Sequence, residues 1–210
     1  MNKKDITDLV ATSLSTLAVF LQVLVVLVAL LGIAALFSAR ARGMLIALRD
    51  MFSGVELWIA FAIALAAMAG SLVFSEYSDF IPCRLCWMQR IAMYPLVIIL
   101  LIGAIRRDRD AALYALAFPP IGIAIGAYHK YIEINPEAES CQASAPCSTK
   151  GIDEFGYVTI PVLAMSAFAA IFVLLLFARS NARAQTRAET SEVEDSTLGE
   201  PGALPLEGDE

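Results

Sequence analysis

Hydrophobic residues are gathered in five long stretches, with shorter polar segments between them. The stretches cover residues 14–37, 57–75, 91–105, 111–128 and 157–178. A helix needs about 20 apolar residues to cross roughly 30 Å of hydrocarbon, where a helix satisfies its own backbone polar groups. The third stretch reaches that length only if residues 87–90 join it, which places Arg90 inside the helix. The pattern predicts an all-α, polytopic membrane protein with five transmembrane helices and its termini on opposite sides.

The fourth stretch carries two local signals. Pro119-Pro120 predicts a kink, because proline cannot donate a helical backbone hydrogen bond. Gly122 and Gly126 follow at a GxxxG spacing, which permits close contact between membrane helices.

The composition agrees with a lipid environment. Hydrophobic residues make up 59% of the chain, and the mean hydropathy is +0.70. Of 15 basic and 21 acidic residues, two and eight lie in the last thirty, so the acidic balance belongs to the tail. The rest of the chain, residues 1–180, has no net charge and no basic stripe, which argues against a nucleic-acid partner. We expect residues 179–210 to form an acidic cytoplasmic tail, disordered after Arg187 because it has little apolar surface to bury.

The basic residues orient the chain through the positive-inside rule. With the N-terminus outside, nine of them are cytoplasmic and six lie outside. A secretory signal over residues 1–41 is a rival interpretation, but its apolar stretch exceeds the roughly 7 to 15 residues of a signal peptide. The cytoplasmic set is Arg40, Arg42, Arg49, Arg106, Arg107, Arg109, Arg179, Arg183 and Arg187; the outer set is Lys3, Lys4, Arg84, Arg90, Lys130 and Lys150.

All four cysteines fall in the two predicted outer loops. Cys83 and Cys86 form a CxxC pair, and Cys141 and Cys147 form a second pair with a wider spacing. Outside a bacterial cytoplasmic membrane such thiols are expected as disulfides. Structural stapling is a weak explanation for a CxxC, because the loop that it closes is very short. A four-thiolate zinc site is another, although the second spacing departs from a usual half-site.

Thiol–disulfide exchange fits the four cysteines best, since a short strained loop keeps its disulfide labile. We therefore predict redox-active cysteines and no metal site. Cys86 should lie in the first turn of a helix, where the helix dipole favours a thiolate. Arg90, one turn further on, would lie on the same face and stabilise a thiolate or an anionic ligand. The alternative is that Arg90 reaches the lipid headgroups.

The electrons from such a site need an acceptor. The sequence has no haem motif, Rossmann glycine fingerprint or iron–sulfur cysteine array, so a lipid-soluble quinone is the economical acceptor. Trp87, Met88 and Tyr94 offer it an apolar surface, although such aromatic residues also form interfacial belts. His129 could donate a hydrogen bond or relay a proton, or it could simply face the headgroups. Glu133, one turn later, is expected on a solvated face.

The residues around the CxxC resemble a known family. The run from Pro82 to Ile91, followed by Met93-Tyr94-Pro95, by Gly126-Ala127-Tyr128-His129 and by a second outer cysteine pair, resembles the DsbB disulfide-bond-formation oxidases. The likeness extends over about residues 57–178. It is closer to the Gram-positive-type branch, whose second cysteine pair is tightly spaced.

The resemblance implies a four-helix bundle core, a membrane quinone (ubiquinone or menaquinone) beside the second CxxC cysteine, and a DsbA-like thioredoxin-fold partner outside the membrane. By position, the partner would attack Cys141, and Cys147 would complete that pair. Cys83 would exchange with this pair, and Cys86 would pass electrons to the quinone beside Arg90. His129 and Gln89 are weaker candidates for contacts with the quinone.

Two departures from the family pattern define the expected domains. The helix over 14–37 is extra, so residues 1–56 form an N-terminal transmembrane helix with a cytoplasmic loop, ahead of the oxidase core at 57–178. The short gap between Cys141 and Cys147 gives no support to a rearranged bond between Cys83 and Cys147. Two alternatives are a vitamin-K-epoxide-reductase-like exchanger, whose CxxC would follow its loop cysteines, and a non-enzymatic scaffold with structural disulfides or zinc.

Overall fold

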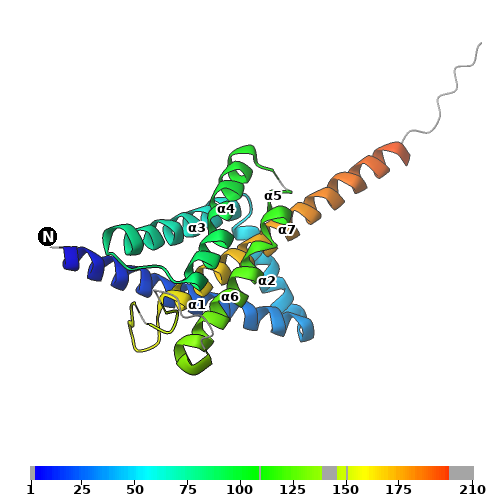
Figure 1. The fold of residues 1–210 in the computed structure, drawn as a ribbon. Helices are drawn as coiled ribbons and strands as arrows, with labels where there is room; N and C mark the ends of the chain where they lie inside the picture. The colour runs from blue at the N-terminus through cyan, green and yellow to red at the C-terminus, as the bar shows by residue number, and fades with distance from the viewer. Residues whose placement is uncertain (1–2, 109, 139–145, 150, 199–210) are drawn as a thin grey trace, which may run out of the picture.

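The computed structural model describes residues 3–108, 110–138, 146–149 and 151–198, and within this part the chain is helical with no β-strand. Figure 1 shows the arrangement of the helices. They are α1 (Lys3–Phe37), α2 (Ala39–Met51), α3 (Glu56–Leu72), the π-helical turn η1 (Val73–Tyr77), α4 (Arg84–Arg106), α5 (Ala111–Ala115), α6 (Phe118–Ile134), the 3-10 turn η2 (Pro136–Ala138) and α7 (Ile160–Leu198).

A bundle of α3, α4, α6 and α7 forms the core. α3 packs against α4 and α7, and α6 packs against the same two helices. The interior is aliphatic and aromatic, with Leu96 and Leu100 of α4 meeting Phe168 and Ile171 of α7, and all four side chains are fully buried. α1 lies on the outside of this bundle and contacts α2 and α7.

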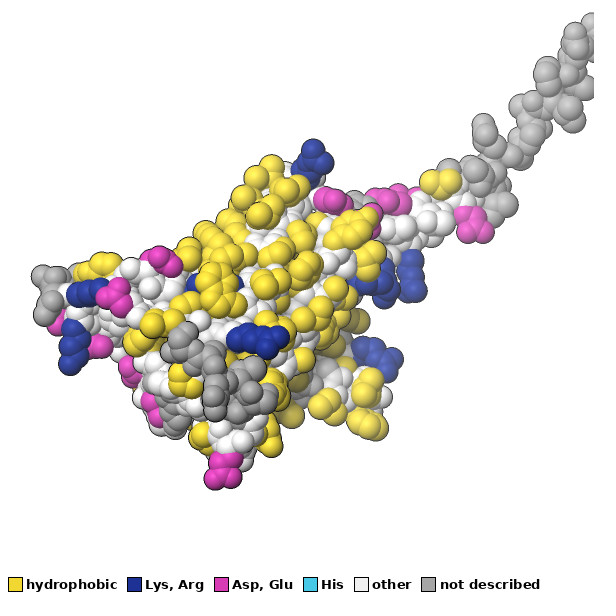
Figure 2. Space-filling view, viewed as in Figure 1, with side chains coloured by type: hydrophobic (Ala, Val, Ile, Leu, Met, Phe, Trp, Pro, Cys, Tyr) yellow, Lys and Arg dark blue, Asp and Glu magenta, His cyan; other side chains and the backbone are white. Residues whose placement is uncertain are grey.

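Five helical segments are long and apolar enough to cross a membrane, as the hydrophobic pattern predicts. They are Lys3–Phe37, Glu56–Tyr77, Arg84–Arg106, Ala111–Ile134 and Ile160–Glu194. Many large apolar side chains on these helices are exposed, as expected for surfaces that face lipid rather than water. Figure 2 shows hydrophobic side chains covering most of the bundle face in view, with acidic side chains mainly towards its edges.

The glycine and proline signals of the fourth stretch have different outcomes. The helix is not merely kinked: it is divided into α5 and α6, and Pro119 and Pro120 lie in the first turn of α6. The close packing at the glycines is confirmed. A Cβ atom on Gly122 would lie 2.3 Å from the Phe168 ring, and one on Gly126 would lie 2.4 Å from Met165 Cγ, so only glycine admits these neighbours.

Two segments are more helical than expected. The expected cytoplasmic loop after the first span contains α2, whose alanine, leucine and arginine residues have high helix propensity. The expectation of disorder after Arg187 is wrong as far as Leu198, because α7 continues to that residue as an extension of the last span (Figure 1). Residues 183–198 contain three glutamates, two alanines and two arginines and no helix-breaking residue, since glycine and proline first occur beyond them, at Gly199 and Pro201.

Candidate redox site

The CxxC motif lies at the N-terminus of α4, as predicted. Cys83 is the N-cap residue, with extended backbone dihedral angles, and its Sγ accepts a hydrogen bond from the Cys86 backbone N–H at 3.4 Å. The Cys83 thiol also donates to Cys86 Sγ, 3.3 Å away. Cys86 is therefore in the first turn of the helix, where unpaired N–H groups and the helix dipole favour a negative sulfur.

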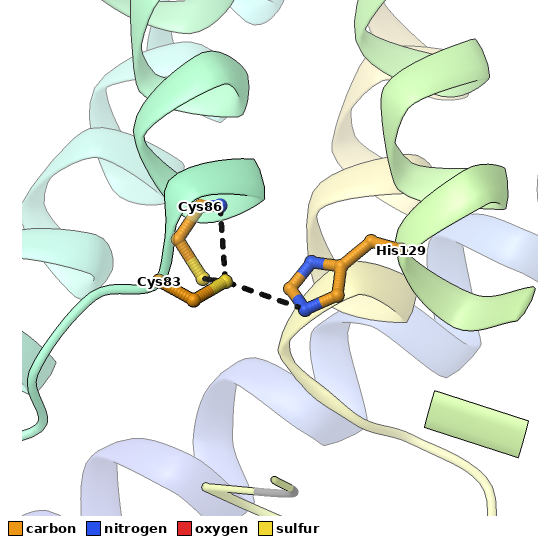
Figure 3. A group of neighbouring side chains, drawn as sticks. All are labelled: Cys83, Cys86 and His129. Carbon is orange, nitrogen blue, oxygen red and sulfur yellow. Dashed lines mark hydrogen bonds between the residues drawn. The ribbon is translucent and has the colours of Figure 1, made fainter. Parts of the chain in front are cut away.

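His129 of α6 faces the same pair of sulfurs. Its Nε2 lies 3.7 Å from Cys83 Sγ and 3.2 Å from the Cys147 carbonyl oxygen, and Figure 3 shows the imidazole directed at the sulfurs. A carbonyl oxygen can only accept, so this contact favours the tautomer with the proton on Nε2. His129 is 3% exposed, and within the described part of the chain Nδ1 has no hydrogen-bond partner. The histidine is thus buried against the thiols rather than exposed to headgroups.

The second cysteine loop reaches the same end of the bundle. Cys147 is buried and packs with Cys83 and Ile132 in a small cluster, against which Cys86 also rests. Cys141 lies outside the described residues, so its predicted pairing with Cys147 stays a prediction. Among the described residues of the second loop, Cys147 is the cysteine that contacts the CxxC.

The electrostatic environment keeps Cys83 protonated. Its hydrogen bond to Cys86 and then its burial raise the pKa of the Cys83 thiol to about 11, against the smaller opposing effects of its hydrogen bonds with His129 and Cys147. The Cys83 thiol thus keeps its proton at neutral pH.

Arg90 is part of α4 and is turned inward. Its Nε donates to Ser71 Oγ at 2.9 Å and its Nη2 donates to the Ser71 carbonyl oxygen at 2.8 Å. The guanidinium also lies 5.1 Å from the centre of the Trp87 ring, a cation–π distance. Arg90 is only 7% exposed, so the alternative that it reaches the headgroups is wrong.

Two cavities meet at Cys86, Arg90 and Ser71. The first is apolar and extends between the helices past Gln89, Met93 and Tyr94. The second is more polar and is lined by Cys83, His129 and Glu133 among others. Cys86 therefore lies between a more polar cavity that holds the thiols and an apolar cavity between the helices.

The apolar cavity contains buried polar atoms that lack partners. Gln89 Nε2 and Tyr94 Oη are buried, line this cavity, and have no hydrogen-bond partner within the described residues. Buried donors without partners are costly, so they suit a ligand that brings acceptor oxygens.

Comparison with known proteins gives the chain a family. The model of the family "Disulfide bond formation protein DsbB" matches residues 53–178, more than half of the chain. This chain belongs to the DsbB family. Its family membership and its five apolar helices together identify it as a multi-pass membrane protein that takes part in disulfide formation.

Its curated relatives support the Gram-positive branch of the DsbB family. The "Probable disulfide formation protein C" of Halalkalibacterium halodurans is 49% identical over 116 residues, which cover 54% of this chain and 85% of the relative. The "Disulfide bond formation protein C" of Bacillus subtilis is 44% identical over 125 residues, covering 58% and 90%. No solved structure matches the chain.

The residues predicted to contact the quinone do not all line the same cavity in this DsbB-family structure. Arg90 and Gln89 line the apolar cavity, whereas His129 lines only the polar one. Trp87 lines neither cavity and is half exposed, so its ring acts on the site through Arg90. Sequence reasoning did not include Ser71, which no motif distinguishes from other small residues of an alanine-rich helix.

Glu133 is the clearest correction. It was expected on a solvated face, but it is 7% exposed and its Oε2 accepts hydrogen bonds from Thr159 Oγ1 at 2.8 Å and from Lys130 Nζ at 2.9 Å. The helix continues to Ile134, which places Glu133 one turn after His129 on the buried face. Its position one helical turn after His129 was the signal in the sequence from which the burial of Glu133 could have been predicted.

The thiols and the imidazole also form a potential metal site. Cys83, Cys86 and His129 each offer one ligand atom, and these atoms lie within 4.8 Å of one another. Two thiolates and an imidazole suit zinc. The prediction that no metal is bound here stays a prediction.

Proposed function

We propose that this chain is a membrane thiol:quinone oxidoreductase. In this proposal it reoxidises a DsbA-like thioredoxin-fold dithiol protein outside the cytoplasmic membrane and delivers the electrons to a membrane quinone, ubiquinone or menaquinone. The observation that carries the proposal is the position of Cys86, which lines both the polar cavity that holds the thiols and the apolar cavity beside Arg90.

The first half of the reaction is thiol–disulfide exchange with the partner. One partner thiolate attacks Cys141 of a Cys141–Cys147 disulfide, which forms a mixed disulfide and releases Cys147 as a thiolate. The second partner thiol then displaces Cys141, so the partner leaves oxidised and this pair is left reduced by two electrons. The assignment of Cys141 as the attacked sulfur comes from its position in the family motif.

The second exchange moves the two electrons to the CxxC. Cys147 attacks Cys83 of a Cys83–Cys86 disulfide and releases Cys86, and Cys141 then displaces Cys83, which restores the first disulfide. The packing of Cys147 against Cys83 supports this direction of attack. The high pKa of Cys83 makes Cys86 the better leaving group, since the thiol of lower pKa leaves faster.

The apolar lining and the unpartnered donors of the first cavity support a quinone as its ligand. A bound quinone would accept two electrons and two protons as the Cys83–Cys86 disulfide re-forms. Arg90 would bind a carbonyl oxygen or developing negative charge, and the unpartnered Gln89 Nε2 and Tyr94 Oη would donate hydrogen bonds. His129 contacts Cys83 on the polar side through the protonated Nε2, so it would donate a hydrogen bond to the Cys83 sulfur as the thiolate forms rather than bind the quinone.

The relay is tested by trapping its first intermediate. The full-length protein, with its disulfides formed, is mixed with a reduced thioredoxin-fold oxidase that keeps only its attacking cysteine and so cannot resolve the mixed disulfide, and the disulfide-linked complex is digested and mapped. We expect a mixed disulfide at Cys141. A Cys141→Ser variant, with Cys147 intact, is the matched control and should trap little. A complex on Cys83 or Cys86, or none at all, contradicts the proposed order.

The rival function is a scaffold whose cysteines hold zinc, which the cluster of Cys83, Cys86 and His129 favours. Metal analysis of protein purified without chelator separates the two functions. Stoichiometric zinc that is lost in His129→Ala, together with thiols inert to a dithiol partner, would support the scaffold. Metal-free protein that exchanges disulfides with the partner supports the oxidase.

A further inference from the structure

The N-terminal helix lies outside the matched family region but lines the apolar cavity. The family match begins at residue 53, whereas α1 ends at Phe37. Leu14, Leu17, Ala18 and Leu21 of α1 nevertheless line the cavity that contains Cys86 and Arg90. These four residues recur at helical spacing, so a single face of α1 closes one side of the cavity.

α1 is seated on the bundle by specific packing. A Cβ atom on Gly70 of α3 would lie 2.5 Å from Leu14 Cδ1, so the missing side chain at this position makes room for Leu14. Ala11, Ser15 and Ala18 are buried on the same helix, and small residues of this kind allow membrane helices to approach closely.

Two hydrogen bonds fix α1 along its axis. Gln22 Nε2 donates to Ser166 Oγ of α7 at 2.8 Å, and Tyr157 donates its hydroxyl to Gln22 Oε1 at 3.1 Å. A glutamine inside a long apolar helix is costly unless it is paired. The pairing of Gln22 with two core residues therefore indicates a fixed docking position.

The opposite face of α1 is built for lipid. Phe20, Val23 and Leu27 are more than half exposed, while the cavity-facing Ala18 is 4% exposed. α1 thus separates the apolar cavity from the surrounding bilayer on this side.

We propose that α1 is the lipid-side wall of the quinone site, and that Ala18 and its neighbours Leu14, Leu17 and Leu21 restrict the quinones that the cavity admits. This inference rests on the proposed function. It makes the extra helix a part of the substrate-binding site rather than a membrane anchor alone. A larger side chain at Ala18 fills space beside Arg90 and Gln89, so quinone binding should weaken while thiol exchange in the polar cavity continues.

The test compares the same substitution at two positions of α1, one that lines the apolar cavity and one that lies outside both cavities. Ala18→Phe and Ala29→Phe are measured in the full-length protein, because Ala29 is exposed and lines neither cavity. For a short-chain benzoquinone analogue we expect Ala18→Phe to raise KM at least about tenfold and Ala29→Phe to change it less than about twofold. Single-turnover reduction of the CxxC by the dithiol partner, without quinone, should keep the wild-type rate in both variants.

A second measurement avoids any dependence on how Ala18→Phe folds. The variant Leu17→Trp changes a cavity residue that is half exposed. In a separate experiment, a photoreactive quinone analogue is applied to the wild-type protein and should label the peptide that contains residues 14–21. Unchanged KM in Ala18→Phe and Leu17→Trp, or labelling confined to α3 and α4, overturns the wall assignment while quinone reduction itself remains. A wild-type protein that reduces no quinone overturns the proposed function and this inference together.

Discussion

Arg90 is held at two points by a single residue, Ser71, which accepts from Nε through its hydroxyl and from Nη2 through its carbonyl oxygen. The fork of a guanidinium makes both bonds at once, which an ammonium cannot do in the same geometry. The bonds fix the cation at the boundary between the two cavities. Ser71 is therefore a positioning residue, which acts on the proposed quinone site through Arg90.

This anchoring predicts a graded loss of quinone binding. Arg90→Lys keeps the charge but loses the two-point attachment, so KM for a quinone analogue should rise roughly tenfold, in line with the value of a charged hydrogen bond. Ser71→Ala removes only the hydroxyl and should raise KM about threefold. Steady-state quinone reduction measures both. Arg84→Lys is the control on the exposed first turn of α4 and should leave KM unchanged.

The pKa of Cys83 predicts how its reactivity depends on pH. Alkylation needs the thiolate, and with a pKa of about 11 its fraction still rises about tenfold per pH unit between pH 8 and 10. Iodoacetamide labelling of Cys83 in the reduced protein, followed by peptide mass spectrometry, should show this rise without a plateau. The His129 hydrogen bond lowers this pKa, so His129→Ala should move the rise to higher pH. A rise that is half complete near pH 9, the ordinary thiol pKa, contradicts the assignment.

The same pKa has a consequence for stability. Because the native pKa lies above the unfolded value of 9.0, the native state favours the protonated thiol. The stability from Cys83 is fully present below pH 9 and is lost as the pH rises from 9 to about 11. Thermal unfolding of the reduced protein should show this loss between those pH values, and Cys83→Ser should reduce it.

The Lys130–Glu133–Thr159 network is predicted to stabilise the site end of the bundle. Lys130→Met removes the cation that pairs with the buried Glu133 carboxylate and leaves the hydrogen bond from Thr159, and breaking a buried ion pair costs about 3–5 kcal/mol. The melting temperature in detergent should fall by several degrees. The pair Lys3–Asp79 is largely exposed, so Lys3→Ala is the control and should have little effect. Equal melting temperatures for the two variants would show that the buried network contributes nothing.

The close approach of α6 and α7 gives a further prediction. Gly122→Ala places a methyl group 2.3 Å from the Phe168 ring, which must shift, so the variant should lose about 1–3 kcal/mol of stability. Gly32→Ala makes the same change in α1, where the new Cβ atom meets nothing within 4 Å. It should leave stability unchanged or slightly higher, because alanine favours helix over glycine. Chemical denaturation in detergent measures the difference.

The hydrophobic pattern was sufficient to predict the membrane helices, because the thickness of a bilayer sets their length. A long apolar run such as residues 14–37 can hardly be anything other than a membrane helix. The position of Cys86 in the first helical turn followed from the proline before the motif and the apolar run after it. For the same reason, Arg90 was correctly assigned to the helix that contains Cys86.

What sequence could not supply was the contact between distant segments. Ser71 became visible only when α3 and α4 were packed side by side, and the burial of Glu133 depended on Thr159, 26 residues later. The role of α1 as a cavity wall required the docking of Leu14 on Gly70. The disorder predicted after Arg187 was wrong as far as Leu198, because the prediction rested on the small apolar surface of the tail and did not consider that the last membrane helix could continue into it.

The central claim is that electrons from a partner dithiol leave through Cys86 to a quinone. The most direct measurement is anaerobic reduction of a soluble quinone analogue by the purified full-length protein with a reduced thioredoxin-fold oxidase. We predict one quinol for each partner disulfide formed, no reaction without the partner, and no turnover by Cys86→Ser. Full turnover by Cys86→Ser, or partner oxidation without quinol, would contradict the account.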